Sequence, residues 1–305
     1  MDFHRRRPSS QTLDWVERVA GARVVAWRRM TGGVASVVHR LTIDRGGDRE
    51  VLVLRQYEHR FFAHIGSDTA ALVRDEFATL RAVHDAGLPA PEPVAADPDG
   101  LGSGGHPAIL MTRLAGRVDV TPGDPEGWLR QIAAMAVRIH DVQIAAAPPF
   151  RKRIDAAAPV VPASATRPAV WEAAFGILRQ RAPEPATCFI HRDLQHFNLL
   201  WRRGRLTGVV DWATSCTGPA DFDIGHCRLN LAVLFGADWA ERFRLAYEAE
   251  AGRAVDPWWD LYAMTAYSDA WRRVITVQVA DRAPVDTAGM TSRVEDLLEA
   301  TLGRL

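Results

Sequence analysis

The chain has 305 residues, of which 48% are hydrophobic, so it can bury a sizeable core and general disorder is excluded. Lysine plus arginine number 37 and aspartate plus glutamate number 37, and this balance excludes a globally basic nucleic-acid-binding surface. No apolar run approaches the roughly 18 residues of a membrane-spanning helix, and no membrane partner is expected.

The N-terminus and the cysteines point to a cytoplasmic protein. Residues 1–8 are basic but lack the apolar segment of a secretory signal, so we expect an exposed end there. The chain has three cysteines, Cys188, Cys216 and Cys227, whose odd count and spacing suit neither a zinc site nor a disulfide framework. We expect them to be buried small hydrophobic side chains in a reducing compartment.

The first third of the chain is predicted to contain strands and one helix. The strand-like runs are 24–27, 34–43, 51–54 and 108–111. A helix is predicted over 69–85, because Val73, Phe77, Leu80 and Val83 form an apolar stripe and Gly87 follows as a stop.

After Gly116 the pattern becomes mostly helical. The predicted helices cover 126–142, a segment opened by Pro168, and the chain from about Gly225 onward, with breaks near 252–257 and 282–287. A linker rich in alanine and proline is predicted at 145–169, and short strands at 188–190, 198–201 and 207–211. The result is an α+β, two-lobed chain with a strand-rich lobe at 1–112 and a helical lobe at 113–305.

One segment carries most of the chemical information. Residues 191–198 read H-R-D-L-Q-H-F-N and fit the spacing H-R-D-L-x-x-x-N. Phosphoryl transfer needs positioning and charge neutralisation, and an aspartate at the acceptor hydroxyl can orient it and take its proton, which predicts Asp193 as the catalytic residue. Asn198 on the same loop and Asp211 at the end of the next hairpin are predicted ligands of Mg²⁺, which prefers oxygen. Any one of the three alone would more often hold a turn or end a strand.

On these residues the chain resembles the aminoglycoside phosphotransferase and choline-kinase-like branch of the protein-kinase-like fold, over nearly its whole length. The family pattern at the catalytic aspartate is H-x-D-x-H-P-G-N, and here residues 195–197 are Q-H-F in place of H-P-G. The downstream family motifs are matched by Asp211-Trp212, Gly218-Pro219 and Phe222-Asp223-Ile224. The resemblance implies that Asp223 supports the catalytic loop. Because Asp223 follows Asp211 by only twelve positions, there is no room for the activation loop of a protein kinase, and a small-molecule acceptor is expected.

The resemblance also implies a donor nucleotide, ATP or GTP, in the lobe at 1–112. The usual strand lysine is absent, because the only lysine, Lys152, lies elsewhere and the strand at 51–54 ends at Arg55. Glu76 falls within the apolar stripe of the 69–85 helix, where a carboxylate needs a partner. We predict that Arg55 pairs with Glu76 and neutralises phosphate charge. A surface salt bridge, or Asp75 as the partner, is the alternative.

Weaker signals complete the predicted nucleotide site. Gly32, Gly33 and Ser36 would approach phosphates through backbone N–H groups and a hydroxyl, with a plain hairpin turn as the alternative. Met111 and Leu114 lie in the segment that, by the resemblance, receives the adenine.

The acceptor side is less defined. Trp258, Trp259, Asp260, Asp269 and Trp271 belong to an aromatic and acidic run that either packs between helices or forms a pocket wall for an amine-bearing or sugar-like acceptor. His226 and Cys227 follow Gly225 and are further candidates to face the pocket, with simple packing as the alternative.

The sequence therefore predicts Mg²⁺-dependent transfer of the γ-phosphate of ATP or GTP to a hydroxyl of a small molecule. The acceptor is an antibiotic, such as an aminoglycoside or macrolide, or a metabolite, such as an amino alcohol or sugar. A non-catalytic nucleotide-binding regulator is the alternative from another class. We expect no nucleic-acid partner, and a monomer or homodimer.

Overall fold

The computed structural model describes residues 7–30, 36–58, 68–145, 147–151, 160–180, 182–279 and 286–305. The chain divides into two compact units, Met1–Ala115 and Gly116–Leu305. The first is rich in strands and the second in helices, and the α+β prediction is confirmed. Assigning nucleotide binding to residues 1–112 and catalysis to residues 113–305 stays a prediction. None of the described helices is both long and apolar enough to cross a membrane.

The first unit is built on a five-stranded sheet in the order β1-β2-β3-β5-β4, with every neighbouring pair antiparallel. Its strands are β1 (Arg23–Arg29), β2 (Ser36–Arg45), β3 (Asp48–Tyr57), β4 (Pro93–Asp97) and β5 (Ala108–Thr112). Gly46 and Gly47 connect the paired residues Arg45 and Asp48 with φ values of 65° and 106°. A two-residue hairpin loop of this kind needs positive φ, which glycine adopts without strain.

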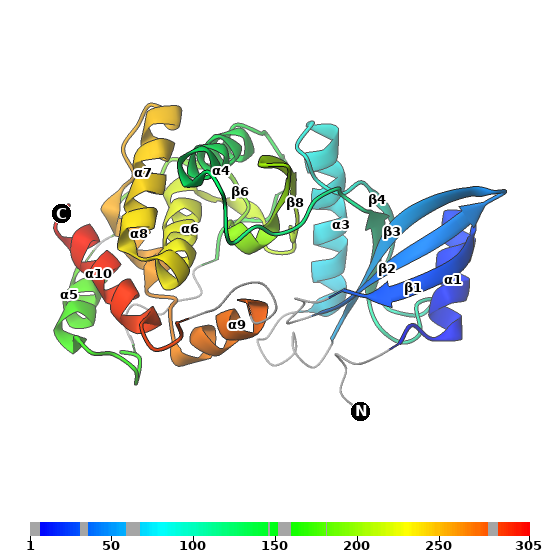
Figure 1. The fold of residues 1–305 in the computed structure, drawn as a ribbon, viewed down its shortest axis with the longest axis horizontal. Helices are drawn as coiled ribbons and strands as arrows, with labels where there is room; N and C mark the ends of the chain where they lie inside the picture. The colour runs from blue at the N-terminus through cyan, green and yellow to red at the C-terminus, as the bar shows by residue number, and fades with distance from the viewer. Residues whose placement is uncertain are drawn as a thin grey trace. The chain divides into compact units, whose positions relative to one another are not determined.

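Strand register sends alternate side chains of β3 to opposite faces of the sheet. Leu52 and Leu54 pack into a core cluster with Trp15 and Val16 of α1 (Ser10–Ala20). Arg55 points to the other face, where it meets Glu76 of α3 (Thr69–Asp85). Figure 1 shows the two helices on opposite sides of the sheet.

The two helices of this unit differ in how well they were predicted. The bounds of α3 agree with the expected helix over 69–85, and its buried face contains Val73, Leu80 and Val83. No element was predicted for α1, although Ser9 caps its first turn by accepting a hydrogen bond from the Thr12 N–H. Gly21 ends it in the left-handed conformation, at φ 61°.

The second unit is a set of helices around α6, and α7, α8 and α10 pack against it (Figure 1). Its helices are α4 (Pro125–His140), α5 (Pro168–Leu178), α6 (Ala220–Phe235), α7 (Ala237–Ala251), α8 (Pro257–Met264), α9 (Asp269–Val279) and α10 (Met290–Leu302). All residues of α6 from 220 to 233 are buried except Asp221. The helical stretch expected from Gly225 has two breaks that were not predicted: Gly236 at φ 100° separates α6 from α7, and residues 265–268 separate α8 from α9.

Two short pairs of antiparallel strands position the motif segment. β6 (Thr187–Ile190) pairs with β9 (Cys216–Pro219), and β7 (Leu199–Arg202) pairs with β8 (Arg205–Val209). Strand β9 was not predicted. The expected strand bounds also need correction, because Asn198 ends the 3₁₀ turn η2 (His196–Asn198) and Asp211 lies beyond the end of β8. The motif segment at 191–198 therefore runs between β6 and β7.

The cysteines are all free thiols. Cys216 and Cys227 are buried, as expected, whereas Cys188 is half-buried. Burial, followed by the nearby Asp223 charge, raises the pKa of Cys188 to about 12.

Candidate active site

Asp223 of α6 binds the backbone of the motif segment at 191–198. The Asp223 carboxylate accepts hydrogen bonds from the backbone N–H groups of His191, at 2.8 Å, and Arg192, at 2.6 Å. His140 Nε2 lies 3.3 Å from the same carboxylate, which is fully buried. These are contacts of the kind that the resemblance implied for Asp223, and they fix the loop backbone directly before Asp193.

One residue of the motif segment and the predicted metal ligand Asp211 have backbone conformations that residues with side chains rarely adopt. Arg192 has φ 67° and Asp211 has φ 70°, both in the left-handed region. Such conformations cost about 1 kcal/mol or more each, persist only where the surroundings hold them, and cluster at functional sites. Asp223 stabilises the conformation of Arg192, because its carboxylate accepts a hydrogen bond from the backbone N–H of this residue.

The Asp193 carboxylate accepts three side-chain hydrogen bonds. Its Oδ1 atom accepts from Gln195 Nε2 at 2.7 Å and from His226 Nε2 at 2.9 Å. Its Oδ2 atom accepts from Asn198 Nδ2 at 2.8 Å. An ionised carboxylate has about four lone-pair positions, so one position on Oδ2 is left for a further donor. The Asp193 side chain is 32% exposed, so the carboxylate is not fully enclosed by its donors.

The same contacts keep Asp193 ionised. Burial pushes the pKa of Asp193 upward, but the hydrogen bond and charge of His226, the charge of His191 and the Asn198 hydrogen bond outweigh it, so the pKa lies below its ordinary value. An ionised carboxylate only accepts hydrogen bonds, so His226 carries a proton on Nε2.

Asn198 and Asp211 lie on two segments that are linked by a backbone hydrogen bond. The N–H of Val210 donates to the carbonyl of Asn198 at 2.9 Å, which holds the residue before Asp211 against Asn198. The Asn198 amide nitrogen also donates to the Asp193 carbonyl at 2.8 Å, so the amide oxygen is the atom that Asn198 can give to a cation.

This oxygen-only donor pair fits Mg²⁺, which usually takes one or two protein ligands together with phosphate oxygens and water. In the described ranges no group of three or more histidine, cysteine, aspartate or glutamate side chains could hold a metal ion. Asn198 and Asp211 thus fit a metal ion that arrives with a phosphate, and they do not form a complete protein cage.

In the first unit the structure brings the predicted pair together. Arg55 Nη1 donates to Glu76 Oε1 at 2.8 Å, and Arg55 Nε donates to Ser36 Oγ at 3.0 Å. The Tyr57 hydroxyl donates to the other Glu76 oxygen. Glu76 is 2% exposed, so its partners satisfy a charge that is buried. The alternative partner, Asp75, is exposed.

Met111 lies on the same face of the sheet as Arg55. The register pairs Arg55 with Val38 and Ile109, and pairs Val53 with Met111 in the next row. Val38, Val53, Ile109 and Met111 therefore share this face of the sheet with Arg55 and with Arg40, which pairs with Val53. Leu114 follows β5 and is half-buried, whereas the predicted residues Gly32 and Gly33, like Lys152, lie outside the described residues.

The structure favours packing for most of the aromatic and acidic run. Trp258 and Trp259 are buried. Asp260 is fully buried and forms ion pairs with Arg228 and, at 2.9 Å, with Arg304. Asp269 accepts a hydrogen bond from the backbone N–H of Ala163 at 2.9 Å. These two carboxylates are therefore used in holding the unit together. Trp271 differs, because its half-buried ring lies 5.3 Å from the His226 ring.

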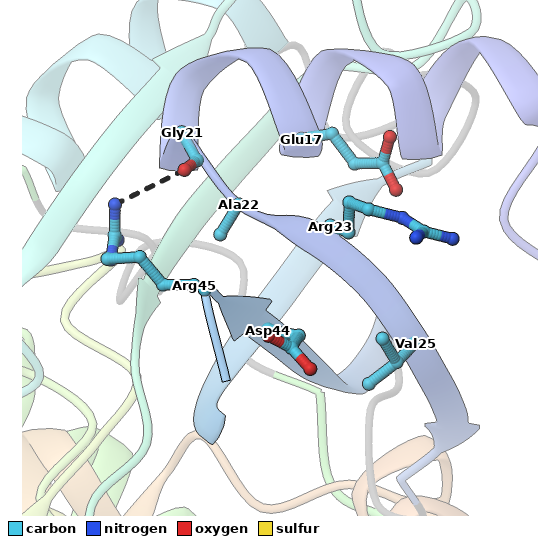
Figure 2. Close-up of a pocket in the computed structure, with 8 residues that line it drawn as sticks. Glu17, Gly21, Ala22, Arg23, Val25, Asp44 and Arg45 are labelled. Atoms are coloured by element: carbon cyan, nitrogen blue, oxygen red, sulfur yellow. Dashed lines mark hydrogen bonds between the residues drawn. The ribbon is translucent and has the colours of Figure 1, made fainter. Parts of the chain in front are cut away.

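A separate hollow of about 590 Å³ lies where α1 meets β1 and the end of β2 (Figure 2). Glu17 in its wall accepts a hydrogen bond from the Val24 N–H at 2.8 Å, and Arg45 donates to the Gly21 carbonyl at 3.4 Å. None of the predicted site residues lines this hollow.

A model of the phosphotransferase enzyme family matches residues 27–262. The chain belongs to this phosphotransferase family. The match includes both units and the motif segment, and it confirms the resemblance. Among curated proteins, the 3-deoxy-D-manno-octulosonic acid kinase of Actinobacillus succinogenes is 36% identical over 76 residues, which are 23% of this chain and 31% of that protein. The match thus spans about a third of the length of that relative.

Solved structures of similar fold are small-molecule phosphotransferases. A thermostable mutant of the aminoglycoside phosphotransferase APH(4)-Ia, in a ternary complex with ADP and hygromycin B, has a TM-score of 0.61 at 17% identity, over 97% of this chain and 98% of that one. The spectinomycin phosphotransferase APH(9)-Ia, in complex with ADP and spectinomycin, has a TM-score of 0.62 at 10% identity, over 97% and 99%. At these identities the likeness shows a shared fold.

Proposed function

We propose that the chain is a Mg²⁺-dependent phosphotransferase that moves the γ-phosphate of a nucleoside triphosphate to a hydroxyl of a small molecule. The observation that carries the proposal is the state of Asp193, an anionic carboxylate with three donors and one remaining lone pair. A residue that only held a turn would not need a side-chain donor from a helix 33 positions further along the chain.

In the proposed reaction the acceptor hydroxyl donates a hydrogen bond to Asp193 Oδ2. As the acceptor oxygen bonds to the γ-phosphorus, the bond from that phosphorus to the β-phosphate oxygen breaks, and the hydroxyl proton passes to Oδ2. Arg55, held by Glu76 and Ser36, neutralises charge on the phosphates. The apolar side chains of Val38, Val53 and Met111 take one face of the base.

Asn198 and Asp211 would hold the metal ion. When bound, Mg²⁺ supplies charge neutralisation on the phosphate oxygens. Gly32 and Gly33 remain proposed phosphate contacts, and Leu114 a proposed contact to the adenine. The structures of APH(4)-Ia and APH(9)-Ia contain ADP, which supports ATP as the first donor to test, with GTP beside it.

The acceptor is proposed only by class. The relatives support two classes: antibiotics such as hygromycin B and spectinomycin, from the structural neighbours, and a sugar acid, from the curated kinase. Because Asp260 and Asp269 have partners within the protein, they give no support to a cationic acceptor. A non-catalytic regulator of the same fold would need neither Asp193 nor its three donors.

The proposal is tested by measuring nucleoside diphosphate formation with Mg²⁺ and either ATP or GTP. The acceptors are hygromycin B, spectinomycin, 3-deoxy-D-manno-octulosonic acid and choline, with mass spectrometry of each product. We expect an acceptor to gain one phosphate, and Asp193→Asn to lower kcat by about 10²-fold or more, the usual contribution of a general base. Equal turnover by the wild type and Asp193→Asn would contradict the assignment of the site.

A further inference from the structure

We propose that His226 is a positioning residue for the phosphoryl-transfer step, which holds Asp193 so that Oδ2 faces the acceptor hydroxyl. This inference rests on the proposed function and adds a role that the motif segment does not contain. His226 lies 33 positions beyond Asp193 in the chain, on helix α6, and its Nε2 atom lies 2.9 Å from Asp193 Oδ1.

One face of α6 carries two residues that hold consecutive parts of the catalytic loop. Asp223 and His226 are three positions apart, so they project from the same side of the helix. Asp223 binds the backbone N–H groups of His191 and Arg192, and His226 binds the side chain of Asp193. The helix thereby fixes the backbone that leads to the catalytic residue and the orientation of its carboxylate.

The approach of α6 to α8 sets the position of His226. A Cβ atom on Gly225 would lie 2.8 Å from the Asp260 carbonyl oxygen and 2.9 Å from the Ala263 Cβ. Glycine therefore permits a close helix contact directly before His226. The imidazole is itself confined, because its side chain is 6% exposed and packs between the rings of Phe222 and Trp271.

The contacts of Asp193 show why this bond has a catalytic consequence. His226 and Gln195 together occupy both lone pairs of Oδ1, so the carboxylate cannot rotate to present that oxygen without breaking both bonds. The remaining lone pair lies on Oδ2. Gln195 stands where the family pattern has histidine, so one of the side chains that orient Asp193 departs from that pattern.

Two substitutions at position 226 separate the hydrogen bond from ring packing. His226→Phe keeps an aromatic ring between Phe222 and Trp271 but removes the N–H donor. His226→Gln loses the ring but keeps an amide donor of similar reach. If the donor matters, the phenylalanine variant is impaired and the glutamine variant is rescued. If only packing matters, the order is reversed.

The measurement is phosphate release from ATP with Mg²⁺ and water as the acceptor, and transfer to any acceptor that the wild type uses. We expect His226→Phe to lower kcat about 10- to 100-fold, as loss of one charge-assisted hydrogen bond predicts, with the KM for ATP within about twofold. We expect His226→Gln to stay within about fivefold of wild-type kcat, and thermal unfolding checks that both variants fold.

The outcomes are distinguishable. His226→Phe with wild-type kcat would overturn the inference while leaving the proposed function intact. Equal impairment of both variants would also overturn it, because the ring and not the N–H would then be required. Wild-type protein with no more turnover than Asp193→Asn would overturn the proposed function itself, and this inference with it.

Discussion

At Asp193, hydrogen-bond donors from two parts of the chain meet on one carboxylate. Gln195 and Asn198 are local, whereas His226 comes from a helix that begins after β9. Local spacing made Asp193 and Asn198 recognisable in the sequence. His226 was recognisable only as a pocket candidate, because a contact between residues so distant in sequence depends on how α6 lies against the loop.

The proposed phosphate-neutralising role of Arg55 can be tested at the residue scale. Arg55→Met removes both the charge and the two hydrogen bonds to Glu76 and Ser36. We expect the Kd for the Mg²⁺–nucleotide complex to rise about 10- to 100-fold, because hydrogen bonds to charged groups contribute about 1.5–3 kcal/mol. Isothermal titration calorimetry measures this effect.

Arg55→Lys is the matched control for that experiment. It keeps the positive charge but cannot reach two partners with a planar fork, so an intermediate Kd is expected. Nucleotide affinity that is unchanged in Arg55→Met would show that Arg55 serves only to satisfy the buried Glu76 carboxylate.

At the scale of elements, the close contact between α6 and α8 organises the second unit. Gly225→Ala would place its Cβ atom 2.8 Å from backbone of α8, so the helices must separate. We expect the free energy of unfolding to fall by about 1–3 kcal/mol, the usual cost of overpacking. Urea denaturation monitored by circular dichroism measures this change.

Gly176 offers a matched control in a helix of the same unit. It lies inside α5. A Cβ atom at that position would have no atom within 4 Å apart from its chain neighbours and the backbone of its own helix. Gly176→Ala should therefore stabilise the protein by about 0.5–1 kcal/mol. Destabilisation by Gly176→Ala, or none by Gly225→Ala, would be inconsistent with this account of the helix contact.

The predictability of each element follows from how local its signal is. The α3 helix was predicted with its observed bounds, because its apolar stripe and its ending are encoded in consecutive residues. The α1 helix has comparable local signals in Ser9, Trp15, Val16 and Gly21, and these are enough to predict it from sequence. Strand β9 has no such pattern, because Gly218 and Pro219 are poor strand formers and pairing with β6 creates it.

At the scale of the whole molecule, the order of the predicted strands and helices along the chain was enough to indicate the fold class. A strand-rich beginning, a helical remainder and one motif segment were enough to predict an α+β phosphotransferase. The burial of Asp260 could not be predicted from sequence, because its partners Arg228 and Arg304 lie 32 positions before it and 44 positions after it. For the same reason the sequence could not decide whether the aromatic run packs between helices or forms a pocket wall. Which surface an aromatic helix face contacts depends on the tertiary structure.

The central claim is that Asn198 and Asp211 bind a metal-bound nucleotide beside Asp193, and it can be tested before the acceptor is known. Thermal unfolding is measured with ATP or GTP, each with Mg²⁺ or with EDTA, for the wild type and for Asp211→Asn. A nucleotide at 100 times its Kd should stabilise the wild type by about 2.7 kcal/mol in the presence of Mg²⁺. The same nucleotide should show no Mg²⁺-dependent shift with Asp211→Asn. No Mg²⁺-dependent shift in the wild type with either nucleotide, or an equal shift in the variant, would contradict the account.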